Sequence, residues 1–139
     1  MSNVKTWPLY YKEYGASWVG QNDVVSRIVL GFDGRITNLK FVNEAMKNLG
    51  QEEVRKQLGG LQYAIQWGIM TLQDAIDFCT LMIQTTSAIQ RFSDGIIANP
   101  GDMPGVGGPV DVAVITADQG FAWVSRKKLK IEGKEIDLD

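Results

Sequence analysis

The sequence predicts an α+β fold in which one layer of two helices covers an antiparallel sheet. Apolar residues recur at helical spacing over residues 51–67 and 71–92. Two further apolar runs, 110–116 and 121–125, flank a short polar turn, which is typical of a hairpin. The chain has 139 residues, of which 45% are apolar and 22% charged. These values fit one globular domain and exclude a disordered or collagen-like chain.

The first third of the chain is interpreted as strands and turns. Residues 27–32 (RIVLGF) form an apolar run, and Asp33-Gly34 after it is the strongest short hairpin signal in the sequence. Residues 35–42 (RITNLKFV) then alternate, although not in strict register. We therefore expect residues 27–32 and 35–42 to pair as antiparallel strands.

Two helices are expected in the middle of the chain. The first, over 51–67, carries apolar residues three or four positions apart, and Gly59-Gly60 weakens it by about 1 kcal/mol per glycine. The second, over 71–92, begins with Thr71-Leu72-Gln73-Asp74, which resembles a capping box. The second helix is so apolar around its circumference that we expect neighbours on more than one side. Cys79 lies in its apolar stripe and is expected to be buried.

A long glycine- and proline-rich loop, 93–109, follows the second helix, and loops of this length are often functional. Its segment 105–109 (GVGGP) fits neither dinucleotide-binding nor P-loop spacing and precedes a strand, so no nucleotide site is expected. Three carboxylates lie in or near the loop: Asp94, Asp102 and Asp111. The sequence does not establish whether they converge. The charged tail is expected to hold a short edge strand and a turn at Glu132-Gly133.

Composition excludes several classes of function. The chain has no histidine and one cysteine, which leaves no histidine-based catalytic triad, no expected metal or cofactor site and no internal disulfide. The net charge is −2, so there is no basic excess to bind nucleic acid or an anionic membrane. With no transmembrane run and no signal-peptide core, we expect a soluble, cytoplasmic protein.

The second half of the chain resembles a known family. Residues 70–76 (MTLQDAI) start a long helix, residues 107–116 (GGPVDVAVIT) form a strand, and residues 120–124 (GFAWV) form its hairpin partner. This order is similar to the C-terminal half of proteasome β-type subunits and related N-terminal-nucleophile (Ntn) hydrolases. The resemblance extends over roughly residues 17–128.

The resemblance implies an Ntn-hydrolase-like fold that lacks the family's N-terminal strands, which carry the nucleophile. Ser2 would become N-terminal if Met1 were removed, but the residues after it do not resemble the family's first strand. The family's Asp-x-x-Ser-Gly-Gly sequence is matched only in part at 102–108, which has an extra residue and no serine. Asp102 and Ser2 are therefore weak catalytic candidates, no catalytic residue is assigned, and enzyme activity stays open.

Strand 110–116 is apolar on both faces, and one helical layer covers only one of them. We expect a homo-oligomer or a complementary second chain to cover the other face.

The first hypothesis for the function is a proteasome-like subunit that acts through assembly. The alternatives are the C-terminal half of a split Ntn amidohydrolase or peptidase, and a small ligand- or peptide-binding module that uses its N-terminal aromatic residues. The expected organisation is a single domain, 1–139, with an aromatic arm (1–16), a proteasome-like core (17–128) and a charged tail (129–139).

Overall fold

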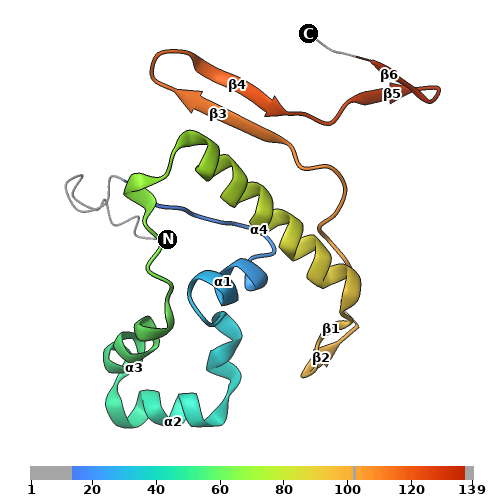
Figure 1. Ribbon diagram of the computed structural model, residues 1–139. Helices are drawn as coiled ribbons and strands as arrows, with labels where there is room; N and C mark the ends of the chain where they lie inside the picture. The colour runs from blue at the N-terminus through green and yellow to red at the C-terminus, as the bar shows by residue number, and fades with distance from the viewer. Residues whose placement is uncertain (1–13, 102, 137–139) are drawn as a thin grey trace, which may run out of the picture. The chain divides into compact units, whose positions relative to one another are not determined.

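The computed structural model describes residues 14–101 and 103–136. The chain is mixed α+β, with four α-helices and small antiparallel sheets in the described part (Figure 1). It divides into two compact units, Met1–Gln73 and Asp74–Asp139, which we call the N-terminal unit and the C-terminal unit. The expected organisation as a single domain stays a prediction.

The described part of the N-terminal unit is helical. Its α-helices are α1 (Asp23–Val29), α2 (Lys40–Leu49) and α3 (Gln51–Leu58). Short 3₁₀ segments stand at Gly34–Asn38, Gly59–Leu61 and Trp67–Ile69. Gly50 alone joins α2 to α3, with a φ of 84° that a residue with a side chain rarely adopts. The buried apolar side chains of this unit are all valines: Val24, Val25, Val29, Val42 and Val54.

The expected hairpin of residues 27–32 and 35–42 is wrong, because both segments are largely helical. Val24, Val25, Ile28 and Val29 follow helical spacing, and helix α1 ends at Val29, two residues before Gly31, whose φ is 87°. Asp33 does not open a hairpin turn. It caps the following 3₁₀ segment by accepting a hydrogen bond from the backbone N–H of Arg35 at 2.7 Å.

The expected helix over 51–67 is also wrong in its extent, since α3 ends at Leu58. Gly59-Gly60 ends the regular helix, and the chain then turns back towards α1. The backbone N–H of Tyr63 donates to the carbonyl oxygen of Val29 at 3.0 Å. A hydrogen bond to another segment therefore replaces the helical bond that the pattern predicts.

Helix α4 (Leu72–Phe92) confirms the long helix expected over 71–92, and the C-terminal unit contains all of it except its first two residues. Three separate two-stranded antiparallel sheets follow: β1 (Gly95–Ile96) with β2 (Asn99–Pro100), β3 (Val112–Thr116) with β4 (Gly120–Ser125), and β5 (Leu129–Ile131) with β6 (Lys134–Ile136). The predicted hairpin after residue 110 is confirmed. The expected single sheet is not, since every sheet in the described residues has only two strands.

Candidate functional site

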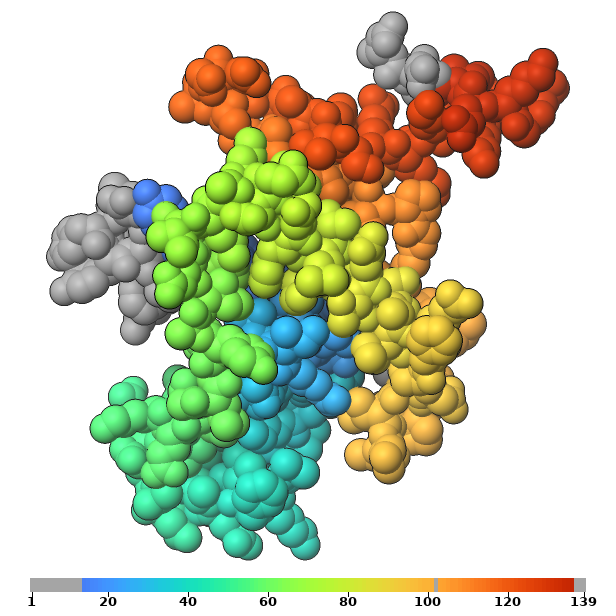
Figure 2. All heavy atoms as spheres, viewed as in Figure 1, coloured from blue at the N-terminus to red at the C-terminus, as the bar shows by residue number. Residues whose placement is uncertain are grey.

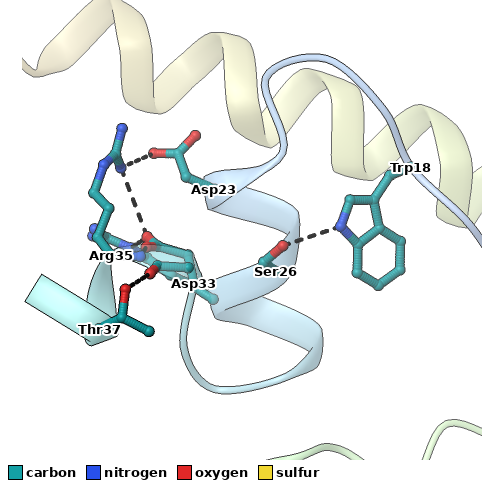
Figure 3. Close-up of polar contacts among 8 residues, drawn as sticks. Trp18, Asp23, Ser26, Asp33, Arg35 and Thr37 are labelled. Atoms are coloured by element: carbon teal, nitrogen blue, oxygen red, sulfur yellow. Dashed lines mark hydrogen bonds and ion pairs between the residues drawn. The ribbon is translucent and has the colours of Figure 1, made fainter. Parts of the chain in front are cut away.

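A buried carboxylate organises the turn after α1 (Figure 3). The side chain of Asp33 is 5% exposed and pairs with Arg27 Nε at 2.5 Å, while Arg35 Nη1 lies 3.7 Å from the same carboxylate. Burial alone would raise the pKa of Asp33. That effect is outweighed by hydrogen bonds from the backbone N–H of Arg35 and the side chain of Arg27, together with the charges of both guanidinium groups. These interactions lower the pKa of Asp33 below its ordinary value of 3.8. Asp33 is thus ionised and fully engaged, which indicates a structural role.

The same turn is held by weaker contacts on either side. Arg35 Nη1 also donates to Asp23 Oδ2 at 3.1 Å, which ties the turn back to the first residue of α1. Trp18 Nε1 donates to Ser26 Oγ at 3.0 Å, and Thr37 Oγ1 donates to the carbonyl oxygen of Gly34 at 2.9 Å. These contacts position the local backbone of the turn.

The β3–β4 hairpin of the C-terminal unit exposes an apolar face. Ala113 lies opposite Trp123, and Ile115 lies opposite Phe121, so these four side chains share one face of the hairpin, which we call the hairpin face. Ile115 is 80% exposed, Phe121 58% and Trp123 49%. The rings of Phe121 and Trp123 meet edge to face with centroids 5.3 Å apart. Every residue of β4 is exposed; this strand belongs to the orange-red segment of Figure 2.

Helix α4 exposes large apolar side chains as well. Leu81, Ile83, Ile89 and Phe92 are all exposed, while Met82 and Thr86 are the buried residues of this helix. The expected burial of Cys79 is wrong, since its side chain is exposed. The stripe containing Cys79 includes Ile83, which is 43% exposed, so the side of the helix assigned from spacing is not its buried side.

A basic strip follows the hairpin face. Arg126, Lys127, Lys128 and Lys130 line an open groove with Pro109, Leu129 and Glu135. The guanidinium of Arg126 stacks over the ring of Trp123 at 5.3 Å from its centroid, and Lys128 pairs with Glu135 at 3.5 Å. The sequence around this strip is strongly basic, since residues 126–134 carry five Lys or Arg and one Glu.

A smaller pocket lies between the end of α4 and the loop before β3, and we call it the α4–loop pocket. Its volume is about 240 Å³. The helix contributes residues four apart over its last turns, namely Ile83, Gln84, Ser87, Ala88, Arg91 and Phe92. The loop contributes Val106, Gly107, Gly108, Pro109 and Val110. The sequence did not predict this pocket; the signals beside it were the apolar helix and the long glycine-rich loop that follows it.

The sequence-predicted site residues are not brought together in the described structure. Ser2 and Asp102 lie outside the described residues, as do Trp7, Tyr10 and Tyr11 of the aromatic arm. Asp111 Oδ1 accepts a hydrogen bond from the backbone N–H of Lys127 at 2.5 Å, which fixes the chain after β4. The carboxyl of Asp94 lies at an exposed position after α4. No acid–base pair is therefore assigned.

Two further observations bear on function. In residues 14–101 and 103–136, no group of three His, Cys, Asp or Glu side chains is placed to hold a metal ion. None of the helices in the described part of the chain combines the length and the hydrophobicity needed to cross a membrane.

Comparison with known proteins leaves the family open. No family model matches the chain, and no curated protein and no solved structure shows significant similarity to it.

Proposed function

We propose that this chain is a non-catalytic, proteasome-like subunit that acts by assembling into an oligomer through its C-terminal unit. The observation that supports the proposal is the exposed hairpin face together with the exposed apolar residues of α4. Ile115, Phe121 and Trp123 alone expose on the order of 300 Å² of side chain, which approaches the largest apolar patch of a typical monomer. Leu81 and Ile89 of α4 are exposed as well and add further apolar surface to the C-terminal unit.

A second copy of the chain is the partner that the charges favour. Residues 74–118 carry six Asp and one Arg, whereas residues 126–134 carry five Lys or Arg and one Glu. One chain thus carries both an acidic and a basic segment in its C-terminal unit. Opposite segments of two copies can face each other at the rim of an apolar contact. An obligate interface of this kind buries about 2,000 Å² or more in total.

The Ntn-hydrolase-like part of this proposal depends on the resemblance of residues 70–76, 107–116 and 120–124. It implies that the chain by itself hydrolyses no peptide or amide bond. A split hydrolase, in which a second polypeptide carries the nucleophile, would instead require a different chain in the assembly. Native mass spectrometry of the protein purified from its own cells distinguishes a homo-oligomer from a two-chain complex.

Sedimentation velocity on two matched variants tests the assembly. Ile115→Asp places a charge on the hairpin face and should lower the association constant at least tenfold. Ile97→Asp is the matched control, because Ile97 is fully exposed, at 102%, in the β1–β2 turn and should leave association unchanged. A wild-type chain that sediments as a 15.4 kDa monomer at micromolar concentration would contradict the proposal. So would equal association of the two variants.

A further inference from the structure

We infer that the α4–loop pocket binds a small monocarboxylate with an apolar body of about ten non-hydrogen atoms. A single chain supplies the whole pocket, because every lining residue lies between positions 83 and 110 of the C-terminal unit. Three features carry it: a wall fixed by hydrogen bonds, one cation at the edge of an apolar lining, and a volume that fits one ring or one branched chain.

The loop wall of the pocket is held in place by α4. Gln90 Oε1 accepts hydrogen bonds from the backbone N–H groups of Gly105 and Val106, both at 2.9 Å. One side chain thus fixes two successive amides of the loop onto the last turns of the helix. A Cβ placed on Gly107 would lie 3.9 Å from Ser87 Oγ, so the loop backbone passes within ordinary contact distance of the helix. A wall fixed in this way lowers the ordering cost that a ligand meets on binding.

The lining selects the charge of the ligand. Arg91 is the single charged side chain among the described lining residues, and most of the other lining residues are apolar. The Arg91 guanidinium lies over the Phe92 ring, 5.1 Å from its centroid, which restrains its orientation. A planar guanidinium matches a carboxylate through two parallel hydrogen bonds, and Ser87 and Gln84 add neutral polar groups to the lining. A cationic ligand would be repelled by Arg91, because these lining residues include no Asp or Glu to bind it.

The volume sets the size of the apolar body. A cavity of about 150 Å³ holds benzene. In proportion, a pocket of about 240 Å³ accommodates a carboxylate attached to one aromatic ring or one branched chain. This chemistry occurs both in free acids and at the C-terminal residue of a peptide. For a ligand of this size in an open pocket, we expect a dissociation constant of about 1 mM.

Ligand-detected saturation-transfer NMR with phenylacetate tests the proposal on the full chain. We expect saturable binding of phenylacetate and at least tenfold weaker binding of the neutral isostere phenylacetamide. Arg91→Gln should weaken phenylacetate binding at least tenfold. Arg55→Gln, on the exposed surface of α3, should leave binding unchanged. N-acetylphenylalanine binding more tightly than phenylacetate would identify a peptide C-terminus as the source of the carboxylate.

A second pair of variants tests the location. Ala88→Leu fills the pocket and should abolish binding, whereas Ala98→Leu, in the β1–β2 turn, should not. Both alanines are exposed, so neither change is expected to prevent folding, and circular dichroism checks this. Equal binding of phenylacetate and phenylacetamide would overturn the inference, as would unaltered binding in Arg91→Gln or in folded Ala88→Leu. An absence of saturable phenylacetate binding would also overturn it.

Discussion

The N-terminal unit buries five valines, whereas the β4 strand of the C-terminal unit buries none of its side chains. In the first unit, the short apolar residues point inwards and the charged residues pair with one another around Asp33. Large apolar residues are exposed in both units, among them Phe41 in the first and Phe121 and Trp123 in the second. In the described part of the second unit, however, Met82 is the only buried apolar residue. The difference indicates that the two units obtain their stability from different sources. The first relies on its own core, and the second is expected to rely on a neighbour.

The largest effect on the N-terminal unit should come from Gly31→Ala. A Cβ at this position would lie 2.7 Å from the Cβ of Leu61, and the φ of 87° is unfavourable for alanine. Backbone strain and overpacking together should cost about 3 kcal/mol of unfolding free energy. Urea denaturation measures this loss. Gly34→Ala, where nothing lies within 4 Å, is the control and should cost much less.

A matched pair of valine substitutions compares the two units directly. Val29 is 2% exposed, and Val29→Ala should lower the unfolding free energy by about 2 kcal/mol through a cavity and lost burial. Val124 is 48% exposed, and Val124→Ala should change it by no more than about 0.5 kcal/mol. Denaturant midpoints for both variants provide the measurement. Equal losses would show that the C-terminal unit buries Val124 in solution.

Asp33→Ala should cost about 2 kcal/mol at neutral pH, because it removes a helix cap and leaves Arg27 without its buried partner. Since the pKa of Asp33 is lowered below 3.8 in the folded state, its ionic contribution is complete above that pH. The contribution is lost as the pH falls through the folded-state pKa. The stability gap between wild type and variant should therefore narrow below about pH 4.

Asp33→Asn sharpens this prediction, because its amide oxygen can still accept from the N–H of Arg35 while the charge is absent. An intermediate loss is expected. A gap between wild type and Asp33→Ala that stays constant from neutral pH to well below pH 4 would contradict the assigned charge effect.

The smallest effect should come from the ion pair of Lys128 and Glu135 in the C-terminal unit. Both side chains are more than half exposed, at 53% and 56%, so water and salt screen the pair. Lys128→Ala should change the unfolding free energy by no more than about 0.5 kcal/mol. Thermal denaturation at low salt measures this change. A substantially larger loss would indicate that a partner desolvates the basic strip.

The sequence predicted the C-terminal elements better than the N-terminal ones, and the valines explain why. Helix α4 and the β3–β4 hairpin follow unambiguous periods and turn residues, and both were confirmed. In α1, Val24, Val25 and Val29 carry a strong preference for strands. The expected strand began at residue 27, which left out the first turn of the helix. Burial of these side chains overrides that preference. The sequence treated Gly59-Gly60 as a weakening of about 1 kcal/mol per glycine within a longer helix, whereas α3 ends before them at Leu58. The chain leaves the helix there because the backbone N–H of Tyr63 bonds to Val29 at the end of α1.

The candidate sites were less predictable than the fold. The exposed apolar surface follows from the apolar pattern of residues 110–116 on both faces, which predicted a need for cover. The α4–loop pocket depends on Gln90 reaching two amides fifteen and sixteen positions away. Sequence spacing alone does not reveal such a contact. The weak candidates Ser2 and Asp102 lie outside the described residues, so their roles stay predictions.

The contact between Tyr63 and Val29 has a consequence for local motion in the N-terminal unit. It brings residues 29 and 63 together and encloses α2 and α3 within one loop of chain. Those two helices contact each other and share few contacts with α1, so we expect them to detach together while that closure persists. Amide hydrogens in α2 and α3 should therefore exchange with solvent at a common rate, faster than those of α1. The N-terminal unit would then contain two cooperative parts with separate opening free energies.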